Sequence, residues 1–155
     1  MGRFCDHVAL GIPSASEYLQ RCRTSFTGTP VRSEFLLEKS LPSWVPLGEG
    51  VLIVVMGGSQ GAIKMNEMVR KILPCLIEKG CRVVHLTGKN DCFYRNRDQE
   101  KSHPNLVVRD FSDEIPALLR NADLAISRSG AGAICELMVT TVSYTHLTLP
   151  TNREV

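Results

Sequence analysis

The stretch Val51-Leu-Ile-Val-Val-Met-Gly-Gly-Ser-Gln-Gly-Ala62 decides the fold of this chain. Its first five residues are apolar and mostly β-branched, which is typical of a fully buried strand in a parallel sheet. Three glycines, Gly57, Gly58 and Gly61, then interrupt the strand, and helical spacing begins at Ala62. We therefore predict a strand, a glycine-rich turn and the N-terminus of a helix in direct succession.

This succession is suited to binding an anion. Unpaired backbone N–H groups and the positive end of the helix dipole point at one place. Gly57 and Gly58 lack a Cβ, so the backbone can approach a diphosphate closely, and Ser59 and Gln60 add side-chain donors. The spacing G-G-x-x-G matches neither the dinucleotide fingerprint nor the P-loop. A turn that only tightens a strand–helix connection is therefore an equally good interpretation of this motif taken alone.

Length and composition indicate a single globular domain. The chain has 155 residues, of which 43% are hydrophobic and 22% charged. A net charge of +2, with no long basic run, gives no indication of nucleic-acid binding. The six cysteines form no C-x-x-C pair and are interpreted as free thiols of a reducing compartment. No apolar run has transmembrane or signal-peptide length, so we expect a cytoplasmic protein that can still dock on a membrane surface.

Strands and helices alternate along most of the chain. Strands are predicted at 7–12, 23–26, 51–55, 81–87, 106–109 and 124–127. Helices are predicted at 15–20 (with Ser14 as N-cap), 33–40, 62–78, 91–101 and 115–121, and a last helix follows Gly130 and Gly132 and runs through Met138. Such alternation predicts an α/β fold with a Rossmann-like, doubly wound parallel sheet. Ligands of these sheets bind outside the carboxyl ends of the strands, where the glycine turns after Val55 and Ser127 both fall.

The second glycine turn lies in Ser127-Arg-Ser-Gly-Ala-Gly-Ala-Ile-Cys-Glu136. Glu136 is expected about one and a half turns inside the following helix. One interpretation is that its charge only complements the helix dipole. The other is that its two oxygens accept hydrogen bonds from the 2′ and 3′ hydroxyls of a ribose, as an acid does in dinucleotide folds. Two phosphate-competent turns and one diol-binding acid would suit a nucleotide diphosphate sugar.

Four motifs together resemble a known family. They are Thr27-Gly-Thr-Pro-Val-Arg32, Met56-Gly-Gly-Ser-Gln-Gly-Ala62, Phe111 with Ile115, and the run Ala122-Asp-Leu-Ala-Ile followed by the second glycine turn. In this order and spacing they resemble the MurG family of bacterial UDP-N-acetylglucosamine transferases, over about residues 4–138. The resemblance implies the GT-B arrangement, in which two Rossmann-like domains face each other across a cleft. In that family the N-terminal domain takes a lipid-linked acceptor and the C-terminal domain takes the UDP-sugar.

The resemblance also implies domain boundaries. Residues 1–32 correspond to the end of the acceptor domain and the linker, and residues 33–141 to an incomplete UDP-sugar-binding domain. The string Val142-Ser-Tyr-Thr-His-Leu-Thr-Leu-Pro-Thr151 matches, codon by codon, the translation of a transposon-type sequencing adapter. A genuine strand of alternating character is the other interpretation. We interpret residues 142–155 as a non-native tail and therefore expect the sheet to end with the strand at 124–127.

By resemblance, donor contacts fall on two glycine turns, on one arginine and on a short segment near the middle of the chain. The positions are Arg32, Gly58, Ser59, Gln60, Gly61, Phe111, Ser112, Ile115, Ser129, Gly130, Ala131, Gly132, Ala133 and Glu136. The family holds uracil near Phe111 and Ser112, and it holds the diphosphate and ribose between Ser129 and Glu136. Phe111 could equally be a core residue, and Arg128 only a salt-bridge partner. The resemblance implies no metal ion and no cofactor besides the donor, and it assigns no catalytic residue here.

The implied reaction moves GlcNAc, with inversion, from UDP-GlcNAc to lipid I, the lipid-linked muramyl-pentapeptide, to give lipid II for peptidoglycan. The implied location is cytoplasmic, peripheral on the inner face of the plasma membrane. One alternative is the donor-binding subunit of a split lipid-linked GlcNAc transferase, and another is a different GT-B lipid glycosyltransferase. Since only the end of the acceptor domain is represented, we expect this chain alone not to catalyse transfer.

Overall fold

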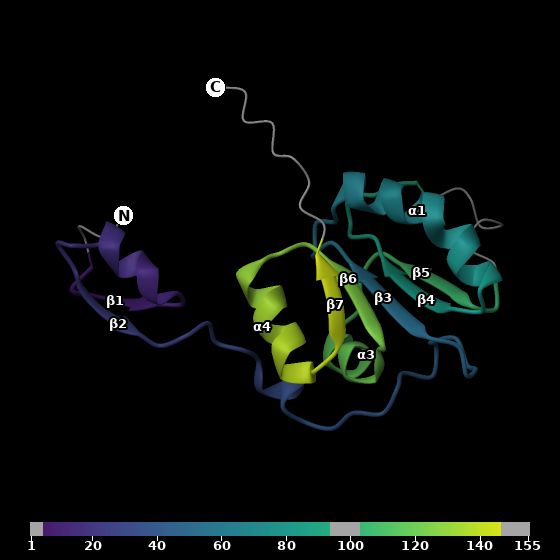
Figure 1. The fold of residues 1–155 in the computed structure, drawn as a ribbon, viewed down its shortest axis with the longest axis horizontal. Coiled ribbons are helices and arrows are strands. Elements are labelled where there is room, and N and C mark those ends of the chain that lie inside the picture. The colour runs from purple at the N-terminus through teal and green to yellow at the C-terminus, as the bar shows by residue number, and fades with distance from the viewer. Residues whose placement is uncertain (1–4, 94–102, 147–155) are drawn as a thin grey trace.

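The computed structural model describes residues 5–93 and 103–146 and contains a five-stranded parallel sheet (Figure 1). The spatial order of its strands is β5-β4-β3-β6-β7, and every neighbouring pair is parallel. The strands are β3 (Leu52–Met56), β4 (Arg82–Leu86), β5 (Leu106–Arg109), β6 (Leu124–Ser127) and β7 (Ser143–His146). The first strand of the sheet in sequence, β3, is also its central strand. The predicted parallel α/β sheet is confirmed.

Helices cover both faces of this sheet, because successive residues of a buried strand point to opposite sides. Ile53 and Val55 pack with α1 (Ile63–Glu78) in one hydrophobic cluster. Leu52 and Val54 pack in a second cluster with α3 (Ile115–Asn121) and α4 (Ala131–Thr140). Figure 1 shows α1 on one side of the strands and α3 and α4 on the other. In the part of the chain that the structure describes, no helix is long and apolar enough to cross a bilayer.

The N-terminal segment forms a small sheet of its own. The strands β1 (His7–Leu10) and β2 (Arg23–Phe26) pair in parallel, and the 3₁₀ helix η2 (Pro13–Tyr18) connects them. In Figure 1 this unit stands apart from the main sheet at the end of an extended segment. The prediction of a helix at 15–20 capped by Ser14 is wrong, because the helix starts at Pro13 after an uncapped Ile12. None of its residues is buried, so no packed face stabilises a longer helix.

The predicted helix at 33–40 is also shorter than expected. The structure has only the 3₁₀ turn η3 (Ser33–Phe35). Phe35 is fully buried in the cluster under α3 and α4, whereas Leu36 and Leu37 are exposed. A single packed side chain anchors one turn but cannot stabilise a two-turn helix.

The main sheet does not end at β6, as predicted, but continues into β7. Residues 143–146 pair with β6 in parallel register, with Leu124 opposite Ser143. Val142, directly before β7, is buried in the cluster with α3 and α4. The segment therefore forms a strand of the main sheet, and excluding it from the fold was wrong. The adapter origin of the segment stays a prediction. Most of the helix predicted at 91–101 lies outside the described residues.

Candidate functional site

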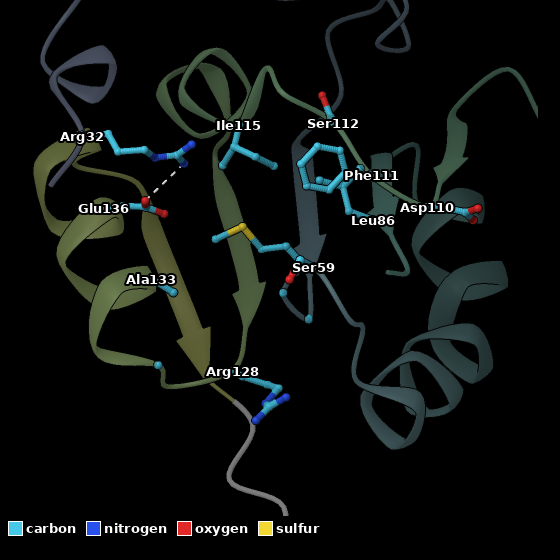
Figure 2. Close-up of a pocket in the computed structure, with 14 residues that line it drawn as sticks. Arg32, Ser59, Leu86, Asp110, Phe111, Ser112, Ile115, Arg128, Ala133 and Glu136 are labelled. Carbon is cyan, nitrogen blue, oxygen red and sulfur yellow. Dashed lines mark hydrogen bonds and ion pairs between the residues drawn. The ribbon is translucent and has the colours of Figure 1, made fainter. Parts of the chain in front are cut away.

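A pocket of about 410 Å³ opens at the carboxyl ends of β3 and β6 (Figure 2). Its lining comes from five segments that are far apart in the sequence. The lining residues are Arg32, Met56, Gly57, Gly58, Ser59, Leu86, Asp110, Phe111, Ser112, Ile115, Arg128, Gly130, Ala133 and Glu136. Nine of them are predicted donor-binding positions, so the structure brings together residues from both predicted glycine turns and from the segment between them.

The first glycine turn forms one wall of the pocket with Gly57, Gly58 and Ser59. Gly58 has a φ of +91°, which favours glycine over residues with a side chain. A Cβ on Gly57 would lie 2.7 Å from the backbone nitrogen of Ala62, so this position also has no room for a side chain. The helix α1 follows without a side-chain cap.

The second turn leads into α4 and contributes the opposite wall. Gly130, Ala133 and Glu136 are spaced three residues apart, which places them along one side of the helix facing the pocket. The N-cap of the helix is Gly130, and Glu136 is the sixth of its ten residues. Glu136 therefore lies well inside the helix and faces the pocket, as an acid that binds a sugar diol must.

Glu136 forms an ion pair with Arg32, which precedes η3. The Arg32 Nη2 atom lies 3.2 Å from Glu136 Oε1, and the two side chains are 56% and 22% exposed. Figure 2 shows this pair at one end of the pocket and Arg128 at the other. The guanidinium of Arg128 has no hydrogen bond or ion pair with the described residues. The prediction that Arg128 serves as a salt-bridge partner is thus not met within this part of the chain.

The third wall follows β5. Phe111 is 48% exposed and lines the pocket, so the interpretation of Phe111 as a core residue is wrong. Ser112 is buried, and its Oγ accepts a hydrogen bond of 3.1 Å from the backbone N–H of Glu114. This bond fixes the turn that starts α3, whose first residue, Ile115, completes the wall. An aromatic ring and an aliphatic side chain here offer a flat apolar surface with backbone groups beside it.

Met56, Leu86 and Asp110 also line the pocket and are not among the predicted donor-binding positions. Met56 and Leu86 are the last residues of β3 and β4, and Asp110 directly follows β5. The rule that ligands bind at the carboxyl ends of parallel strands could have found all three. Five predicted positions belong to the same two turns but do not line the pocket, namely Gln60, Gly61, Ser129, Ala131 and Gly132.

A polar cluster lies next to the pocket, beneath α1. Asp91 is buried and accepts hydrogen bonds from Asn66, Arg70 and the backbone N–H of Phe93. Burial acts to raise the pKa of Asp91, but these hydrogen bonds outweigh it and hold the pKa below its ordinary value. His85 is also fully buried; burial, together with the charge of Arg70, lowers its pKa to about 4, although Asp91 opposes the shift. Asp91 is therefore charged and His85 neutral at pH 7.

Across residues 5–93 and 103–146, no three His, Cys, Asp or Glu side chains are grouped as a metal site requires. The sheet, its two layers of helices and the position of the pocket are those of a Rossmann-like domain, a class that binds nucleotides at this edge of the sheet.

The family model of the glycosyltransferase family 28 C-terminal domain matches residues 52–153. The chain belongs to this family. The matched range includes residues 142–153, which the sequence analysis set aside as a tail.

Relatives with curated names agree with this assignment. A protein of Prochlorococcus marinus (strain NATL2A) is 98% identical over 140 residues, which are 90% of this chain and 40% of the relative. A protein of Synechococcus sp. (strain CC9605) is 58% identical over 139 residues, covering 90% of this chain and 38% of the relative. Both are named UDP-N-acetylglucosamine–N-acetylmuramyl-(pentapeptide) pyrophosphoryl-undecaprenol N-acetylglucosamine transferase. The chain thus spans about two fifths of the length of these curated relatives.

Two solved glycosyltransferases share the fold. MurG of Acinetobacter baumannii matches with a TM-score of 0.59 and 21% identity, over 95% of this chain and 46% of that protein. SnogD of Streptomyces nogalater matches with a TM-score of 0.57 and 21% identity, over 94% of this chain and 39% of that protein. These matches confirm the expected GT-B type of Rossmann-like domain.

Proposed function

We propose that this chain is the donor-binding part of a transferase that moves GlcNAc from UDP-GlcNAc to the lipid-linked muramyl-pentapeptide, forming lipid II. The observation that carries the proposal is the 98% identity, over 140 residues, to a relative named for this reaction. The pocket supports it, because nine predicted donor-binding residues line one cavity. Residues 33–141 would be the UDP-sugar-binding unit, and residues 1–32 the end of the acceptor domain and the linker. The enzyme would work at the inner face of the plasma membrane.

Each wall of the pocket takes one part of the donor in this proposal. The apolar wall of Phe111 and Ile115 holds the uracil ring, and Glu136 accepts hydrogen bonds from the ribose hydroxyls. The turn of Gly58 and Ser59, with the guanidinium of Arg32, faces the diphosphate. Positive charge and N–H groups at this place stabilise the negative charge that develops on UDP as the bond to the anomeric carbon breaks. The remaining predicted positions in the two turns shape the backbone around the diphosphate.

The experiment measures transfer of radiolabelled GlcNAc by the full-length Prochlorococcus marinus (strain NATL2A) relative, with a lipid I analogue or diacylglycerol as acceptor. Calorimetry on this chain, with UDP and ADP as probes, tests the pocket separately. We expect transfer to the lipid I analogue only, and preferential binding of UDP by the chain. Transfer to diacylglycerol, or equal affinity of the chain for UDP and ADP, would contradict the proposal.

A further inference from the structure

The segment of residues 87–91, which we call the supporting segment, lies directly behind the first glycine turn. Its backbone N–H groups at Lys89 and Asn90 donate hydrogen bonds of 3.2 Å to the carbonyl oxygens of Ser59 and Gln60. The side chain of Asn90 also donates to Gln60 Oε1 at 3.3 Å. Three contacts thus join this segment to the two residues at the tip of the turn.

The fit between the two segments leaves no room for side chains. A Cβ on Gly61 would collide with the carbonyl oxygen of Thr87, and a Cβ on Gly88 would collide with the backbone of Gly61. Both glycines have φ values near +80°. The path of the glycine turn is therefore set by the surface that the supporting segment presents to it.

The supporting segment also reaches the third wall of the pocket. The N–H of Gly88 donates a 3.0 Å hydrogen bond to the carbonyl oxygen of Asp110, which lines the pocket next to Phe111. One short segment thus contacts both the turn expected to hold the diphosphate and the wall expected to hold the base.

Buried side chains of α1 hold the supporting segment in place. Asn66 is fully buried and donates through Nδ2 to the carbonyl oxygen of Thr87 at 2.8 Å and to Asp91 Oδ2 at 2.7 Å. Arg70 donates to the same carboxylate oxygen at 2.8 Å. Hydrogen bonds to a charged acceptor in a buried setting are stronger than neutral ones, so this contact stabilises the position of the supporting segment. Neither Asp91 nor its two partners from α1 lines the pocket.

We propose that Asp91 is a positioning residue for the diphosphate. Bound to Asn66 and Arg70, it locks the supporting segment. The supporting segment in turn fixes the backbone of Ser59 and Gln60, next to Gly58, where we propose that the phosphates bind. Asp91 touches no ligand, so its effect passes entirely through the turn. The inference rests on the proposed binding of UDP and adds a residue to the machinery that selects the diphosphate over the nucleoside.

The test compares the affinity of the whole chain for UDP with its affinity for uridine, which has no phosphate. We expect Asp91→Ala to weaken the binding of UDP about five- to twentyfold and to leave the binding of uridine unchanged. A loss of this size lies in the range of coupling energies measured between residues of one hydrogen-bond network. Asp91→Asn, which keeps the volume but cannot accept both side-chain hydrogen bonds on one charged oxygen, should lose about two- to tenfold on the same grounds.

Asp123 provides a matched control. Its Oδ2 accepts a 2.7 Å hydrogen bond from the backbone N–H of Leu52, at the end of the sheet opposite to the pocket. Asp123→Ala, like Asp91→Ala, should lower the melting temperature, but it should leave the ratio of UDP to uridine affinity unchanged. An unchanged ratio in both Asp91 variants, or the same change in Asp123→Ala, would overturn the inference. Failure of the unsubstituted chain to bind UDP at all would count instead against the proposed function.

Discussion

Glu136→Ala tests the ribose contact most directly. If the carboxylate accepts hydrogen bonds from the ribose hydroxyls, each charge-assisted bond contributes about 1.5–3 kcal/mol. The bound state must also loosen the ion pair with Arg32, whose side chain is 56% exposed. Such an exposed pair is worth about 0–1 kcal/mol. For one such bond the net loss on substitution is then about 0.5–3 kcal/mol, which corresponds to roughly a 2- to 160-fold weaker affinity for UDP.

The assay is calorimetric titration with UDP and with 2′,3′-dideoxy-UDP, which lacks both hydroxyls. The unsubstituted chain should bind the dideoxy ligand more weakly than UDP, and Glu136→Ala should bind the two ligands with similar affinity. The control is Arg32→Ala, which removes the same ion pair but leaves the carboxylate, so it should keep the preference for UDP.

One result would refute this reasoning. If Glu136→Ala lowers the affinity for UDP and the affinity for dideoxy-UDP by the same factor, the carboxylate does not bind the diol. Glu136 would then act only on the shape of the pocket or on the dipole of α4.

Three further predictions concern other parts of the site. Arg128→Gln should weaken the binding of UDP by about threefold to tenfold, and more so at low salt, but leave the binding of uridine unchanged. The reason is that this cation, which has no partner among the described residues, lies at the pocket and attracts the diphosphate. Equal losses of affinity for both ligands in calorimetry would contradict this. Gly61→Ala should lower the free energy of unfolding, measured in urea, by about 1–3 kcal/mol. The reason is that Gly61 has a φ of +84° and a Cβ there would collide with the carbonyl oxygen of Thr87. Gly130→Ala should change the free energy of unfolding little, because the space around Gly130 is open. Similar losses of stability in the two variants would count against the steric reasoning. His85 has a folded-state pKa of about 4, below its unfolded value, so the unfolded chain binds the extra proton between pH 6.5 and 4. The free energy of unfolding should therefore fall by about 2 kcal/mol from pH 8 to 5. His85→Gln should flatten this slope, and an unchanged slope would refute the assignment.

The central fold could be predicted because its signals are local. The helix α3 and the strand β6 lie where the sequence analysis expected them, and α1 starts within one residue of the prediction. These elements carry regular apolar periodicity or end at clear breakers such as Gly80, whose φ of +78° terminates α1. The helices predicted at 15–20 and 33–40 were wrong. These segments have helical composition, but each buries one residue at most, so no tertiary packing supports a longer helix.

The candidate site was predictable in part for a related reason. Gly58 and Glu136 carry a backbone or charge requirement that is visible in the sequence. Leu86 and Asp110 carry no such local requirement, and only their position at the carboxyl ends of β4 and β5 indicates that they lie near the pocket. The role inferred for Asp91 depends on contacts with a helix about twenty residues earlier, which no local pattern encodes.

The central position of β3 has a consequence for how the protein is made. Ile53 pairs with Val83 on one side and with Leu124 on the other, so its second neighbour lies 71 residues further along the chain (124 minus 53). At a translation rate of about 5–20 residues per second, the ribosome needs roughly 4–14 s to deliver that neighbour. During this interval β3, α1 and β4 can assemble, while Leu52 and Val54 lack the partners from α3 and α4 that later cover them. The nascent chain thus carries an uncovered apolar sheet face for seconds, a state that a ribosome-bound chaperone would recognise.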